Sequence, residues 1–274
     1  MVTYKNNIVM SRFSTVSALL ALFYTVIYFI PMELSAIEIR VGTTLFIFLP
    51  FQIIPFFIAV IIFFGSYWIL ETHPNLIRRR NMMRQVLPNI VLPTMSVLIF
   101  SFILAQTSKG ITWWGLLCLG VFFYMLVLYS EYQVLKPDVS SGTVFTILLI
   151  GLAHALFMVL AIAMRASISR IFVLAPALVL VVTFVVFRTL FLRSGGKVRT
   201  YWIVFVTFII GQFAVSLYYL FITPNQYGLT LTAILFSCNA LTARIGHGDQ
   251  KKLFIEPLAM SLFLILWIIL SKIN

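Results

Sequence analysis

Four polar side chains interrupt long apolar stretches and have the chemistry for a binding site. Glu131, Arg188 and Glu256 are ionisable, and Asn239 carries a neutral amide. A charge at the centre of a bilayer costs about 2.5–3.5 kcal/mol on insertion scales, so such groups need partners. Three interpretations stay open: a cytoplasm-facing polar pocket with a Glu–Arg pair, a packed structural ion pair, or side chains that reach the membrane surface and fix the topology.

His154 is a fifth candidate, because it lies near the middle of an apolar stretch. Small residues on one face let helices approach closely, and the face of His154 at helical spacing consists of Gly151, His154, Ala155, Met158, Ala161 and Arg165. The imidazole could hydrogen-bond across that interface, or it could be a proton relay or a ligand to haem or a chlorophyll-like pigment. A bis-histidine haem needs a second histidine at depth, whereas His73 and His247 are expected in loops.

Motifs for metal, nucleotide or catalytic sites are missing from the sequence. There is no Gly-rich phosphate loop and no HExxH pattern, and no paired aspartates could hold Mg²⁺ with a diphosphate. Cys118 and Cys238 both lie in apolar stretches without zinc or disulfide spacing. The sequence therefore predicts no cofactor and no metal site, and it disfavours a membrane-embedded enzyme acting on lipid.

The composition indicates that membrane helices must position these residues. Hydrophobic residues make up 62% of the chain and charged residues 9%, whereas soluble proteins contain about 25% charged residues. The net charge of +12 could suggest nucleic acid, but the cations lie in short loops between apolar stretches. We therefore expect a lipid bilayer around the chain and no nucleic acid as a partner.

Nine stretches are candidates for helices that span a bilayer, which takes about 20 apolar residues, and the eighth, 228–243, is short. The predicted fold class is an all-α integral membrane protein, with one polytopic domain over residues 1–274. The predicted helices cover residues 13–30, 51–70, 86–105, 112–135, 143–163, 171–192, 201–222, 228–243 and 253–271. Residues 31–40 are predicted to form a loop, and residues 41–49, before Pro50, an interfacial or re-entrant piece.

The distribution of lysine and arginine predicts the orientation. With a cytoplasmic N-terminus and nine alternating helices, 14 cations fall inside and 5 outside, as the positive-inside rule requires. The C-terminal Asn274 then lies outside. This count supports the short helix over 228–243, because without it the cations of 244–252 would move outside. The same threading places Glu131, Arg188, Asn239 and Glu256 near one depth on the cytoplasmic side.

Short motifs along the chain are similar to those of a known family. They are Thr72-His73-Pro74 with Leu87-Pro88, then Trp113-Trp114 leading to Glu131-Tyr132 and Pro137-Asp138, then Gly211-Gln212 to Tyr219 with Pro224 and Tyr227-Gly228-Leu229, and last Glu256-Pro257-Leu258. The chain resembles a family of uncharacterised bacterial multi-pass membrane proteins, a domain of unknown function. The resemblance runs from about residue 70 onward. It implies a helical inner-membrane protein and no particular activity.

These observations predict a multi-pass protein of the bacterial plasma (inner) membrane. We expect a non-enzymatic membrane component or accessory subunit, with other membrane proteins as candidate partners. The alternative is a transporter or channel for a small or amphipathic solute, which would use the broken 41–70 stretch and the level of Glu131, Arg188 and Glu256 as its site. A lipid enzyme ranks third.

Overall fold

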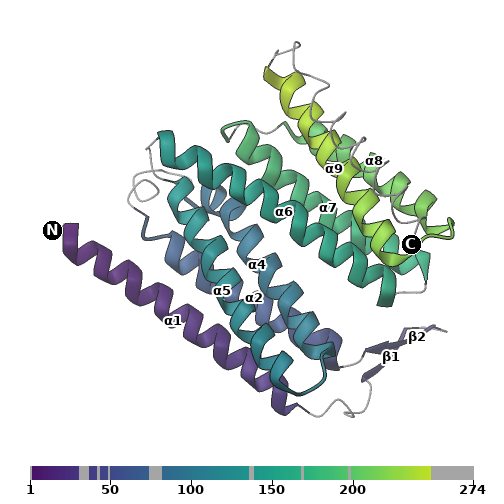
Figure 1. The fold of residues 1–274 in the computed structure, drawn as a ribbon, viewed down its shortest axis with the longest axis horizontal. Helices are drawn as coiled ribbons and strands as arrows, with labels where there is room; N and C mark the ends of the chain where they lie inside the picture. The colour runs from purple at the N-terminus through teal and green to yellow at the C-terminus, as the bar shows by residue number, and fades with distance from the viewer. Residues whose placement is uncertain are drawn as a thin grey trace. The chain divides into compact units, whose positions relative to one another are not determined.

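The computed structural model describes residues 2–30, 37–41, 44–48, 50–73, 82–135, 139–167, 170–196 and 199–247. Long helices make up most of this part of the chain (Figure 1). The elements are α1 (Val2–Phe29), β1 (Ile37–Val41), β2 (Thr44–Phe48), α2 (Pro50–Leu70), α4 (Met82–Gln106), α5 (Ile111–Val134), α6 (Val139–Ser167), α7 (Ile171–Arg193), α8 (Thr200–Tyr218) and α9 (Pro224–His247).

The predicted fold class, a helical integral membrane protein, is confirmed. Eight helices in the described residues are long and apolar enough to cross a membrane. The short eighth span is among them and is longer than predicted, since α9 ends at His247 rather than at residue 243. His247 is therefore a helical residue, not a loop residue as predicted. The ninth predicted helix, 253–271, lies outside the described residues, and the N-in orientation stays a prediction.

The chain divides into two compact units, Met1–Phe145 and Thr146–Asn274. Each is described by itself, and the single domain over 1–274 stays a prediction. In the first unit α4 packs against α2 and α5, and α1 packs against α2, α4 and α5. Most side chains of α4 are buried, so this helix is the centre of the unit.

A β-hairpin corrects the prediction for residues 37–41 and 44–48, where strands were not expected. β1 pairs antiparallel with β2, with Ile37 opposite Phe48 and Val41 opposite Thr44. The prediction had a loop over 31–40 and a re-entrant or interfacial piece over 41–49; the interfacial position stays a prediction. Both edges of a two-stranded sheet carry unpaired backbone groups, which favours a place outside the hydrocarbon region. The predicted break before the next helix is confirmed, since α2 begins at Pro50.

In the second unit α7 packs against α8, and both pack against α9. α9 approaches α6 closely at Gly228: a Cβ there would clash with Cγ1 of Ile162 and lie 3.1 Å from the carbonyl oxygen of Met158. Gly151, which was predicted to allow close approach, is exposed and has open space where a Cβ would lie. The glycine at this contact is therefore Gly228 of α9, not Gly151 of α6.

Candidate functional site

His154, Thr189 and Asn239 meet inside the second unit and are called here the His–Thr–Asn cluster. They come from α6, α7 and α9, and all three side chains are buried. The amide nitrogen of Asn239 lies 3.0 Å from the Thr189 hydroxyl and 3.5 Å from Nε2 of His154. The cluster thus joins three helices through two of the five predicted site residues.

The hydrogen bonds define the state of the imidazole. Nδ1 of His154 lies 2.7 Å from the carbonyl oxygen of Ile150, which can only accept, so Nδ1 carries the proton. Nε2 then offers a lone pair, toward which Asn239 donates. The Thr189 hydroxyl donates to the carbonyl oxygen of Val185 at 2.8 Å and accepts from Asn239. Both ring nitrogens of a neutral histidine are therefore engaged.

One atom of the cluster has no partner among the described residues. Both N–H groups of the Asn239 amide point to acceptors, and its carbonyl oxygen Oδ1 is buried without a donor. A buried acceptor without a hydrogen bond is costly and uncommon. This oxygen is the position at which the cluster could accept a further hydrogen bond.

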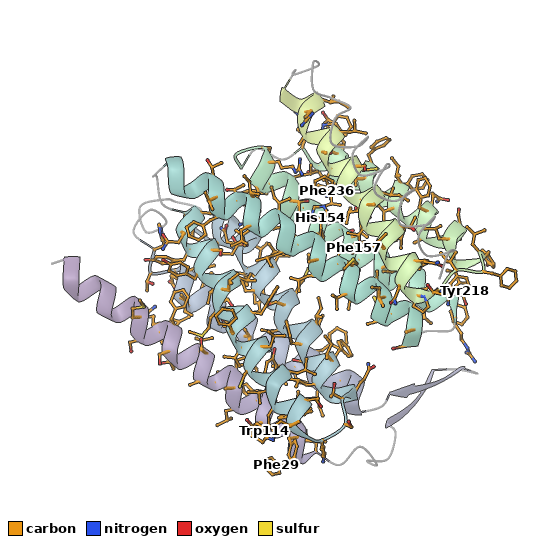
Figure 2. The ribbon with its side chains drawn as sticks, viewed as in Figure 1. Phe29, Trp114, His154, Phe157, Tyr218 and Phe236 are labelled. Carbon is orange, nitrogen blue, oxygen red and sulfur yellow. The ribbon has the colours of Figure 1, made fainter. Side chains whose placement is uncertain are left out.

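An aromatic ring of α9 contacts the imidazole. The Phe236 ring stands edge-on to His154 at 5.1 Å between centroids, and the Arg193 guanidinium lies 5.3 Å from the centre of the same ring. Figure 2 shows His154 close to Phe236 and Phe157 in the middle of the helices. Neither Phe236 nor Thr189 was predicted from the sequence, because neither type stands out in an apolar helix until its neighbours are known.

The other predicted site residues fall in different places. Arg188 is fully buried on α7, directly before Thr189, and its guanidinium lies 5.6 Å from the ring centre of Phe191. Glu131 is fully buried on α5 in the first unit. Glu256 lies outside the described residues. A common pocket for Glu131, Arg188, Asn239 and Glu256 stays a prediction.

The first unit holds its own buried polar contacts between helices. The hydroxyls of Ser66 on α2 and Tyr124 on α5 hydrogen-bond at 3.0 Å, and the Tyr24 hydroxyl of α1 donates to the carbonyl oxygen of Val97 on α4 at 3.3 Å. Within the described ranges, no group of three or more His, Cys, Asp and Glu side chains is placed to hold a metal ion. These two contacts thus bind helix to helix.

The comparisons with known proteins show the family of the chain. No curated protein and no solved structure matches the sequence. A family of proteins of unknown function, DUF5656, matches residues 32–271. This match starts earlier than residue 70, so the hairpin and α2 are included in the family region. Because the match covers most of the chain, the protein belongs to the DUF5656 family of proteins of unknown function.

Proposed function

We propose that the protein is a non-enzymatic component of a membrane assembly, an accessory subunit in the plasma membrane of a bacterium. One observation carries the proposal: the buried polar groups of the His–Thr–Asn cluster hydrogen-bond helix to helix. A catalytic base or a ligand to a cofactor needs a free lone pair directed at a reacting atom. In His154 one ring nitrogen donates to its own helix and the other faces Asn239.

The apolar surface of α8 supports a role in assembly. Val204, Phe205 and Phe208 are all more than half exposed and lie on consecutive turns of one face of this helix. Large aromatic side chains on a helix surface are suited to contacts with lipid or with another membrane protein. We propose that this face contacts a second, larger membrane protein.

Site-specific photo-crosslinking tests this role in intact membranes. A photoreactive amino acid at Phe208 should give one protein adduct of constant mass, and the same residue at the buried Ile210 of α8 is the matched control. The purified complex in mild detergent should keep that partner at fixed stoichiometry. A protein that runs as a clean monomer on native gels and gives no protein adduct from Phe208 would refute the proposal.

A transporter is the second candidate, and the buried Oδ1 of Asn239 is the observation that favours it. An acceptor without a donor is what a passing solute or water would use. The native Cys238 precedes Asn239 on α9 and serves as a reporter once the exposed Cys118 is changed to serine. Transport predicts modification of Cys238 by a charged, water-soluble thiol reagent. Labelling by N-ethylmaleimide alone would exclude an aqueous route to this position.

A further inference from the structure

Arg165 lies in an aromatic cage at one end of the second unit. It is in the last turn of α6, and its guanidinium carbon lies 4.5 Å from the ring centre of Tyr218 and 5.8 Å from that of Tyr227. Tyr218 is the last residue of α8, and Tyr227 is in the first turn of α9. Three helix ends therefore meet around one cation, and Figure 2 shows Tyr218 at this end of the helices.

The cage is built before any ligand arrives. Gly228 lets α9 approach α6 closely at Ile162, which lies about one helical turn before Arg165. The neighbouring Tyr227 is therefore held beside Arg165. The hydroxyl of Tyr227 donates to the carbonyl oxygen of Ala214 on α8 at 3.1 Å, which fixes its ring. The start of α9 is capped reciprocally by Thr223 and Gln226, with bonds of 3.1 and 3.3 Å.

The guanidinium lacks an acceptor in the part of the chain that the structure describes. Arg165 forms its cation–π contacts there but no hydrogen bond or ion pair, and its Nε is buried without a partner. Residues 146–247 contain no aspartate or glutamate, so this segment supplies no counterion of its own. A guanidinium presents five N–H donors in a planar fork that matches an oxyanion.

The surroundings of the cage match the boundary between lipid and water. The turn from α8 to α9 exposes Tyr219, Leu220 and Phe221, and Phe221 is fully exposed. Aromatic side chains next to a basic residue at the end of a spanning helix are typical of the headgroup level. The phosphate groups of phospholipids lie at that level. Arg165, which lacks an acceptor among the described residues, is therefore at the depth of lipid phosphates.

We propose that Arg165, held over the rings of Tyr218 and Tyr227, binds the phosphodiester of an anionic phospholipid, with the exposed α8–α9 turn at the same headgroup level. Tyr218 and Tyr227 hold the plane of the guanidinium, and the N–H groups that do not face the rings donate to phosphate oxygens. Arg170 is exposed five residues further along the chain, and its guanidinium contacts the ring of Phe172 but no tyrosine.

Native mass spectrometry of the full chain with added phosphatidylglycerol tests this site. The wild-type protein should retain one lipid more strongly than the rest. Arg165→Gln should weaken that retention about tenfold, which corresponds to about 1.4 kcal/mol. Arg165→Lys keeps the charge but loses the planar fork, so it should also weaken retention. Arg170→Gln removes the same charge outside the cage and should leave it unchanged.

Two further arms identify the ligand. Phosphatidylcholine should replace phosphatidylglycerol poorly, and millimolar inorganic phosphate should not displace it. Displacement by phosphate would overturn the lipid assignment in favour of a soluble phosphate. Equal losses in Arg165→Gln and Arg170→Gln would show that surface charge alone binds the lipid, and unchanged retention in Arg165→Gln would show that another group already neutralises Arg165. Where Arg165→Gln fails to fold, Tyr218→Ala decides, because it opens the cage and keeps the charge.

Discussion

Gly228→Ala should separate α9 from α6, whereas Gly151→Ala should not. Both glycines lie within spanning helices of the second unit, and both substitutions add one methyl group. At Gly228 the new Cβ would overlap Cγ1 of Ile162 and press on the Met158 carbonyl oxygen and the Ile162 nitrogen. At Gly151 it would meet no atom within 4 Å. The two variants therefore make the same chemical change and differ only in the space around the new methyl group.

The magnitude follows from the atoms that the new methyl group meets. The Met158 oxygen and Ile162 nitrogen would be 3.1 and 3.2 Å away, against 3.4–4 Å for ordinary contact. Backbone atoms cannot rotate aside, so the helices must move apart by a few tenths of an ångström. Such overpacking costs about 1–3 kcal/mol. Alanine also gains about 1 kcal/mol over glycine in a helix interior, but this gain is common to both variants and cancels in their difference.

The assay is the free energy of unfolding of the two variants in the same bicelles, measured by steric trapping and followed by circular dichroism. Gly228→Ala should be about 1–3 kcal/mol less stable than Gly151→Ala, and Gly151→Ala should be at least as stable as the wild type. Equal stabilities of the two variants would refute the close approach at Gly228, and with it the placement of Tyr227 beside Arg165.

Three other predictions follow from contacts and charges already described. A double-mutant cycle with Ser66→Ala and Tyr124→Phe should give a coupling of about 0.6 kcal/mol, the average for interhelical hydrogen bonds in a membrane protein, and zero coupling would contradict the 3.0 Å contact. The purified protein should show no visible absorbance, because both ring nitrogens of His154 are engaged; a coloured protein that bleaches in His154→Ala would show the opposite. A cytoplasm-only reporter fused at Asn274 should be inactive, and activity there would refute the outside position of the C-terminus predicted from the positive-inside rule.

The helices could be predicted because hydrophobicity and length specify them almost alone. In lipid, the backbone N–H and C=O groups of a segment such as 171–192 must hydrogen-bond within the segment, so a helix can be predicted without knowing its neighbours. The structure agrees, since α7 covers Ile171–Arg193. The hairpin was missed because residues 31–40 were assigned to a loop and 41–49 to a re-entrant or interfacial piece, and the pairing of one with the other was not considered. The alternation of apolar and charged residues over 37–41, and the two residues Gly42-Thr43 before the next apolar run, are signals of a hairpin that the sequence contained.

The polar cluster could be predicted only in part. His154 and Asn239 were recognised separately, since each is a rare polar type in an apolar helix. Their pairing depends on how α6 and α9 pack, and that packing depends on the close contact at Gly228. The sequence shows that this residue is a glycine, but it does not show which helix the glycine contacts. Thr189 was missed because a threonine in an apolar helix usually bonds its own backbone, as Thr189 does with Val185 while it also accepts from Asn239.

The charge of residues 146–247 is entirely positive. Residues 146–247 contain seven lysines and arginines and no acid. Two of these cations, Arg165 and Arg170, lie where α6 ends and α7 begins, and Arg188 is fully buried within α7. Because this segment contains no acid, an anion that pairs with its cations must come from outside 146–247, whether from an acid elsewhere in the chain, from a partner protein or from lipid. A cationic solute has no carboxylate to bind in this segment, which is the reason that we propose an anionic phospholipid as the ligand of Arg165.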